Sequence, residues 1–154
     1  MKTNLDEKYM RIALKEAQSA VILDEVPVGA AIVKDGKILA KGHNLREKSN
    51  DPTSHAEINA IRKACKKLNS WRLEGATIYV TIEPCSMCAG TLLQCRIGRI
   101  VYGALDPKGG AIESSLELFN AKNINHHPEV ISGVLKEECS SIITNYFKAK
   151  RQSK

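Results

Sequence analysis

The sequence has no apolar run approaching the length of a membrane-spanning helix, and its first residues lack the pattern of a secretory signal. A helix needs about 20 consecutive apolar residues to cross a bilayer, and a signal peptide joins a basic start to a short apolar core. We therefore expect a protein that neither spans a membrane nor is secreted, and we predict a cytoplasmic location.

Cysteines do not occur in the pairs that a disulfide framework would need. The chain has five, an odd number, scattered along its length, which favours reduced thiols. With 154 residues, 43% hydrophobic and 26% charged, the composition is typical of a single folded domain covering residues 1–154. The formal net charge of +6 is compatible with a polyanionic partner, although many basic proteins bind none.

The spacing of apolar residues predicts an opening hairpin followed by alternating strands and helices. Tyr9 and Ala13 stand at helical spacing, Asp35-Gly36 is typical of a hairpin turn, and the polar residues 45–54 are predicted to form a loop. This order predicts an α/β fold, a mixed sheet with helices on both faces. Helices are predicted at about residues 5–23, 55–68, 84–96, 116–121 and 135–150, and strands at about residues 30–33, 38–40, 77–82, 99–103 and 129–132.

Three residues offer the ligand atoms that zinc prefers. His55 supplies an imidazole nitrogen, and Cys85 and Cys88 supply two thiolate sulfurs. Two cysteines three residues apart lie on one face of a helix, so both can reach the same ion. A helix beginning near Pro84 would place its positive N-terminal end beside the thiolates and favour their charged form. Three protein ligands leave one position open for water, as in catalytic zinc sites.

The alternative is a structural zinc site, which needs a fourth protein ligand. Cys95 would lie about 10 Å beyond Cys88 along a continuous helix, and Cys65 about 15 Å beyond His55 along another. Neither can share the ion. Helix length does not exclude four residues that are distant in sequence as a fourth ligand. These are Cys139, His43, His126 and His127.

Glu57 lies two residues beyond His55. A carboxylate beside a metal-activated water can carry its protons, and a structural zinc site has no use for one. Glu57 therefore favours a catalytic site. Residues two apart on a regular helix point to roughly opposite faces, so His55 must lie at an irregular helix start if both side chains are to meet the metal.

His55-Ala56-Glu57 followed by Pro84-Cys85-x-x-Cys88 resembles the signature of the zinc-dependent cytidine and deoxycytidylate deaminase superfamily. The resemblance implies a three-layer α/β/α sandwich around a five-stranded mixed sheet, with one zinc ion per chain where two helix N-termini meet at the sheet edge. It also implies that His55, Cys85 and Cys88 hold the zinc. Zinc hydroxide would then attack the ring carbon that bears the amino group, and Glu57, which is not a ligand, would shuttle the protons.

Longer stretches resemble one subfamily, the bacterial tRNA adenosine deaminases. They cover residues 26–30, 83–90, 102–111 and 133–147. The reaction that this resemblance implies is hydrolytic deamination of adenosine to inosine at the wobble position of a tRNA anticodon, with the base extruded from its loop into a pocket. The implied partners are the anticodon stem-loop of a tRNA and, in a homodimer, a second copy of the chain.

The resemblance also implies contacts with the target base and its loop. Asn44 would hydrogen-bond the base, Val28 with Glu25 nearby would line the pocket, and Asp106 and Lys108 would contact the anticodon loop. Each has a structural alternative. Asn44, Asp106 and Lys108 could serve turns, and Val28 could simply be the first strand residue.

The end of the last predicted helix would bind the RNA around the target. Tyr146 and Phe147 would stack on a neighbouring base, unless they are core residues of that helix. The cations that follow would contact phosphates, which strengthens binding without setting sequence choice. These cations are Lys148, Lys150, Arg151 and Lys154.

Two residues depart from the subfamily pattern, and two other functions stay open. Glu113 stands where glycine is usual, and Arg46 follows Asn44 at a variable position. The first rival is a free-base deaminase acting on guanine, because residues 49–66 resemble that family nearly as well. The basic C-terminal helix argues against it, since a free base offers no phosphates. The second rival is a non-catalytic, zinc-stabilised RNA-binding module, against which Glu57 argues.

Overall fold

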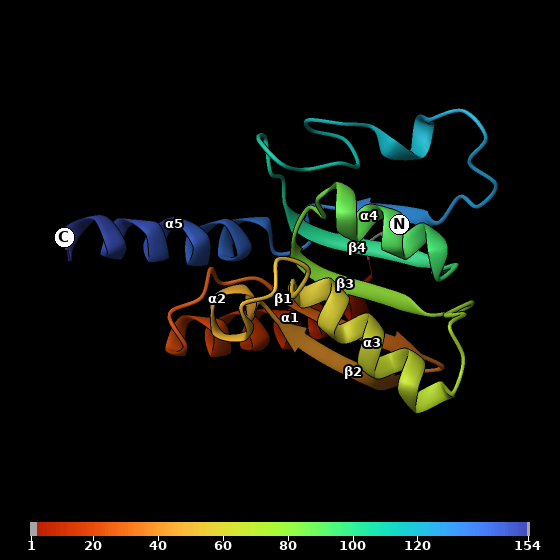
Figure 1. Cartoon of the computed structure of the whole chain (residues 1–154), viewed down its shortest axis with the longest axis horizontal. Coiled ribbons are helices and arrows are strands. Elements are labelled where there is room, and N and C mark those ends of the chain that lie inside the picture. Colours follow the sequence, from red (N-terminus) through yellow and green to blue (C-terminus); the bar gives the residue numbers. More distant parts are fainter. Residues whose placement is uncertain (1–2, 154) are drawn as a thin grey trace.

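In this computed structural model, which describes residues 3–153, five strands form one sheet (Figure 1). The strand order is β2-β1-β3-β4-β5. β1 (Gly29–Lys34) pairs antiparallel with both β2 (Lys37–His43) and β3 (Thr77–Ile82). β4 (Arg99–Ala104) runs parallel to β3, and β5 (Glu129–Ser132) runs parallel to β4. The predicted mixed sheet of five strands is confirmed.

Helices cover both faces of this sheet (Figure 1). α1 (Asn4–Ile22) and α5 (Lys136–Gln152) lie on one face. α3 (Ala56–Leu68) and α4 (Ser86–Gln94) lie on the other. Between residues 3 and 153, no helix combines the length and the apolar character needed to cross a membrane.

The side chains of the central strand β3 point alternately into the two cores of the sandwich. Ile78 and Val80 are fully buried in the core beneath α3 and α4, together with Leu92 of α4. Tyr79, between them, points the other way and packs with Met10 of α1. Because successive strand residues face opposite sides, one apolar strand serves both layers. The three-layer α/β/α sandwich is confirmed.

Two segments differ from the prediction. The expected loop at residues 45–54 contains a four-residue helix, α2 (Arg46–Ser49). The carboxylate of Glu25 accepts two backbone N–H groups of this helix, so α2 depends on a distant residue that no local pattern reveals. The helix expected at residues 116–121 is only a 3₁₀ turn, η1 (Leu118–Asn120), which begins without a side-chain cap.

Two glycines allow helices to lie directly on the sheet. A β-carbon on Gly29 of β1 would lie 1.9 Å from the carbonyl oxygen of Ala13 in α1. One on Gly42 of β2 would lie 2.5 Å from the carbonyl oxygen of Ala56, the first residue of α3. Only glycine fits at such close approaches. Gly42 thereby lets the start of α3, which follows His55, lie against β2.

A buried carboxylate ties α1 to the middle of the sheet. Asp6 is 1% exposed and receives hydrogen bonds from both terminal nitrogens of Arg99, each at 2.7 Å, and from the hydroxyl of Tyr79 at 2.8 Å. Burial alone would raise the pKa of Asp6, but the hydrogen bonds from Arg99 and Tyr79 outweigh it and lower the pKa to about 2. The ionised form of Asp6 therefore stabilises the fold.

Candidate metal centre and active site

The three candidate ligands meet where α3 and α4 begin. His55 is the extended residue that caps α3, Cys85 is the equivalent residue of α4, and Cys88 lies in the first turn of α4. The Nδ1 atom of His55 lies 3.6 Å from the Sγ atom of Cys85 and 3.6 Å from that of Cys88. Cys88 is buried, and the other two are half-buried. The structure thus brings together residues from two separate segments of the chain.

The geometry of this cluster fits zinc. In a tetrahedral site, zinc–nitrogen bonds of about 2.05 Å and zinc–sulfur bonds of about 2.3 Å place nitrogen and sulfur about 3.6 Å apart. The separation of 3.6 Å between His55 Nδ1 and each sulfur equals that value. A hydrogen bond from Cys88 lowers the pKa of Cys85 to about 4, and the same interaction raises the pKa of Cys88. This interaction favours a thiolate at Cys85, the form that binds zinc.

The cluster offers three candidate ligands rather than four. Among the described residues, one group of His, Cys, Asp and Glu side chains could hold a metal ion. It consists of His55, Cys85 and Cys88. The four residues that the sequence left open as a fourth ligand are not in this group. His43 contacts a carboxylate and His126 a backbone carbonyl. Cys139 is buried on the opposite face of the sheet, and His127 is exposed. A zinc ion held by these three side chains would keep a fourth position for water, as in catalytic sites.

Glu57 lies beside the cluster in the first turn of α3. It is 3% exposed, and its carboxylate hydrogen-bonds with the thiol of Cys88. Burial raises the pKa of Glu57 to about 7. His55 has extended backbone angles, φ −79° and ψ 158°, so the helical period does not separate it from Glu57. The irregular helix start that the sequence required is present.

The two residues predicted to face the target base lie next to each other at the end of β2 and the start of β1. Asn44 is 7% exposed, and its amide nitrogen donates to the carbonyl of Val26 at 3.3 Å. Its amide oxygen accepts the N–H of Arg46 at 3.2 Å. The backbone N–H of Asn44 donates to the carbonyl of Val28 at 3.2 Å, and Val28 is half-buried. Asn44 therefore has local turn partners, and its contact with a base stays a prediction.

Glu25 is turned toward α2. It is 1% exposed, and its two carboxylate oxygens accept the backbone N–H groups of Glu47 at 3.0 Å and Lys48 at 2.7 Å. Both oxygens are thus engaged at the N-terminus of a helix, where an anionic group is favoured. Glu25 holds α2 beside the Asn44 segment, and a direct contact with substrate stays a prediction.

Asp106 and Lys108 lie in the loop after β4. The Oδ1 atom of Asp106 accepts the backbone N–H groups of Lys108 and Gly109, each at 3.2 Å. This is the turn role that the sequence offered as the alternative for Asp106. The side chain of Lys108 is exposed, so it is free to meet a large ligand.

The predicted RNA-binding residues of α5 lie beside α2. The hydroxyl of Tyr146 donates to the carbonyl and the carboxylate of Asp24, at 3.2 and 3.1 Å. Phe147, 42% exposed, meets the Tyr146 ring edge-on. Together with Arg151 they line a cleft of about 380 Å³ that reaches Val26. Figure 1 shows the C-terminal part of α5 extending beyond the sheet. Lys154 lies outside the described residues.

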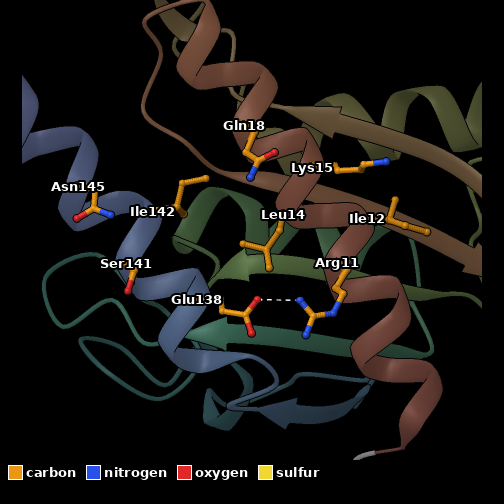
Figure 2. A pocket seen from close by; sticks show the side chains of 9 residues that line it. All are labelled: Arg11, Ile12, Leu14, Lys15, Gln18, Glu138, Ser141, Ile142 and Asn145. Carbon is orange, nitrogen blue, oxygen red and sulfur yellow. Dashed lines mark hydrogen bonds and ion pairs between the residues drawn. The ribbon is translucent and has the colours of Figure 1, made fainter.

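A cleft of about 620 Å³ lies away from all these residues, between α1 and α5 (Figure 2). Arg11 and Glu138 form an ion pair across it, 2.8 Å apart. The metal cluster lies at the start of α3 and α4, on the opposite face of the sheet. None of the predicted site residues lines this cleft, so its size does not make it the active site.

Two acidic residues near the cluster have roles that sequence reasoning missed. Glu83, directly after β3, is 2% exposed and accepts hydrogen bonds from the loop that carries Asp106. Glu113, the departure from the subfamily pattern, accepts a hydrogen bond from the hydroxyl of Tyr102. Its charge therefore has a partner within the protein. The signals available for Glu83 were its place at the end of an apolar strand and at the start of residues 83–90, which resemble the tRNA adenosine deaminases; neither shows which groups it binds.

Comparisons with known proteins agree with this geometry. The model of the MafB19-like deaminase family matches residues 4–151, which include every candidate metal ligand. The chain is 48% identical to the tRNA-specific adenosine deaminase of Bacillus subtilis (strain 168) over 149 residues, covering 97% of this chain and 92% of that protein. It also resembles a structure solved in work on A-to-I editing by tRNA:A34 deaminases at the wobble position of transfer RNA. The TM-score is 0.86 at 48% identity, with 88% of this chain and 98% of that one covered. The guanine deaminase of Bacillus subtilis has a TM-score of 0.63 at 33% identity, with 95% and 93% covered.

Proposed function

The chain belongs to the MafB19-like deaminase family, and we propose that it is a tRNA-specific adenosine deaminase that converts the wobble adenosine of an anticodon to inosine. One observation carries the proposal: the similarity to the tRNA-specific enzyme of Bacillus subtilis runs through nearly the whole chain. It is closer than the similarity to a guanine deaminase. The reaction consumes water and releases ammonia.

The proposal gives each residue of the cluster a chemical role. His55, Cys85 and Cys88 hold one zinc ion, which is supported by their donor types and spacing. A bound zinc ion would lower the pKa of a coordinated water toward neutrality and so supply the attacking hydroxide. Glu57 would take up one proton from this water and give it to the adenine ring nitrogen, and would then take up the second proton from the new hydroxyl on the ring carbon and give it to the amino group, which leaves as ammonia. Burial favours the protonated form of Glu57, so the group can return a proton that it has accepted.

The same proposal places the RNA around α5 and the loop after β4. Lys108 is exposed on that loop, and α5 ends in exposed cations next to the Tyr146–Phe147 pair. Cations of this kind contact phosphates, and aromatic rings stack on unpaired bases. Asn44 and Val28 lie side by side and form the wall against which the extruded base rests. Arg46 is exposed, lines a cleft together with Tyr146, and adds a further cation.

We further propose a homodimer in the cytoplasm. The resemblance to the tRNA deaminases implies the dimer, and large apolar side chains are available at the surface, including Trp71 at 58% exposed and Leu116 at 53%. Exposed apolar surface is used in many protein interfaces. Sedimentation at micromolar concentration should give the mass of two chains, and a stable monomer would contradict the dimer. The cytoplasmic location follows from the proposed tRNA substrate.

The proposed activity is tested with three substrates in parallel. Purified zinc-loaded protein is incubated with an anticodon stem-loop bearing a wobble adenosine, with free adenosine and with free guanine. The expected product is inosine from the first two substrates and xanthine from the third, and each product is measured. We expect inosine in the stem-loop and little turnover of the free compounds, which lack phosphates for the basic surface. Rapid turnover of guanine with no reaction of the stem-loop would instead establish a guanine deaminase. Tight RNA binding without any turnover would establish a non-catalytic module.

A further inference from the structure

Glu83 occupies a site in which almost every part of its carboxylate is engaged. It is the residue between β3 and the Pro84-Cys85 pair, and it is 2% exposed. Its Oε1 atom accepts the backbone N–H of Asp106 at 3.1 Å and the hydroxyl of Ser114. Its Oε2 atom accepts three successive backbone N–H groups, those of residues 112–114, at 3.1, 2.8 and 3.0 Å. Five donors thus converge on one side chain.

These donors come from the two ends of a single loop. The loop of residues 105–114 leaves β4 and carries Asp106 and Lys108. Glu83 binds its first part through Asp106 and its last part through residues 112–114. Next to Glu83, the carbonyl of Pro84 accepts the N–H of Ala111 at 2.9 Å. The loop is therefore held at both ends by the short segment that leads directly into Cys85.

The space around the carboxylate is closed as well. A β-carbon on Gly110 would lie 2.3 Å from the Cδ atom of Glu83, so the loop backbone passes directly over the side chain. The five donors supply the hydrogen bonds that a carboxylate buried in this way requires.

We propose that Glu83 is a positioning residue that sets the loop of residues 105–114 at a fixed distance from the metal centre. The inference rests on the proposed function, in which this loop contacts the RNA and Cys85 holds the zinc. Glu83 then fixes the position of the residues that contact the anticodon loop relative to the residues that act on the base. Misplacement by about 1 Å at a distant contact can lower the rate about a hundredfold, so such an alignment has kinetic weight.

Glu83→Gln tests the role because it should disturb one bond and spare the others. If the amide nitrogen occupied the Oε2 position, it would face three N–H groups. In the Oε1 position it faces only one, since the hydroxyl of Ser114 can turn and accept instead of donating. The variant should therefore keep the bonds to residues 112–114 and release the N–H of Asp106. Hydrogen exchange of the Asp106 amide should become faster by on the order of tenfold, with a smaller change at residues 112–114.

The kinetic consequences are measured on the zinc-loaded protein with the anticodon stem-loop. We expect Glu83→Gln to keep one zinc per chain and to raise KM by on the order of tenfold with a smaller change in kcat. Gly110→Ala should act in the same direction, because its new methyl group pushes the loop away from an intact Glu83. Glu117→Gln makes the same chemical change on an exposed side chain of the following segment and should behave as wild type.

A double-mutant cycle with Lys108→Ala separates positioning from simple support of the fold. If Glu83 acts through the loop, Lys108→Ala should raise KM less in the Glu83→Gln protein than in the wild type. Independent, multiplicative effects would overturn the proposal. So would equal acceleration of exchange throughout the protein, or a loss of activity that only follows a loss of zinc. If the wild type fails to deaminate the stem-loop, the proposed function falls, and an unchanged Asp106 exchange rate in Glu83→Gln would refute the positioning role separately.

Discussion

Replacing Glu57 by glutamine should abolish turnover while leaving the metal site and the fold intact. General acid–base catalysis is worth about 10²–10⁴-fold in rate, or about 3–5 kcal/mol of barrier at 1.36 kcal/mol per factor of ten. We expect the upper end for Glu57, since the carboxylate is only 3% exposed and solvent cannot easily take its place. Burial disfavours the charged carboxylate and raises its pKa, so a neutral amide of the same shape should not lower the Tm.

The assay combines three measurements on one preparation. Inosine formed in a wobble-adenosine stem-loop is measured under single-turnover conditions, zinc per chain by atomic spectroscopy, and Tm by circular dichroism. Glu74→Gln is the matched control, because it makes the same change on an exposed side chain paired with Arg72. If Glu57→Gln lost its zinc, Glu57 would be a ligand, and its assignment as proton carrier would be wrong. Activity within a factor of ten of wild type would also refute the assignment.

The metal ligands, the basic helix and the buried carboxylate of α1 each lead to a further prediction. Cys85→Ala should lose both zinc and activity, whereas Cys95→Ala, at the far end of α4, should keep both; metal analysis with the inosine assay decides, and full zinc in the first variant would contradict the ligand set. Truncation after Asn145 should raise KM for the stem-loop and leave zinc unchanged. It should also reduce the slope of log affinity against log salt concentration by just under one unit for each duplex phosphate that the removed cations neutralise. An unaltered slope in a salt titration would exclude α5 from RNA binding. Asp6→Asn should destabilise the fold at pH 7 by about 2 kcal/mol, because the pKa of Asp6 is lowered to about 2 by the bonds from Arg99 and others. That contribution is complete above the unfolded pKa near 3.8 and is lost as the pH falls toward 2, so urea unfolding of wild type and variant should converge below pH 3.

The parts of the structure that could be predicted are those that short stretches of sequence specify. The strand at residues 77–82 was predicted with the same bounds as β3, since a run of β-branched residues needs no distant partner to be recognised. Cys85 and Cys88 could be grouped because helical spacing acts over a few residues. His55, 30 residues before Cys85, could be added only from its ligand chemistry and from the resemblance to the deaminase signature. The requirement that His55 leave the helix also followed from spacing alone, and the structure gives it extended angles.

The parts that could not be predicted depend on contacts between distant residues. α2 lies in a polar stretch that by itself resembles a loop, and it is held by Glu25, more than 20 residues earlier. The role of Glu83 depends on a loop that begins more than 20 residues later. Helix length excluded Cys65 and Cys95 from the ligand set, and neither belongs to the cluster in the structure. Helix length could not show that both line one cleft between α3 and α4.

Gly42 limits how the base pocket of this enzyme can diversify. It lies two residues before Asn44, and its missing side chain allows the carbonyl of Ala56 to approach to 2.5 Å from where a β-carbon would be. Any other residue would displace the first turn of α3, and with it His55, relative to Cys85 and Cys88. In evolution or in a mutant library, we therefore expect a change at Gly42 to disturb the candidate metal centre before it can alter base preference. New specificities must arise from the side chains around it, on a backbone that stays the same.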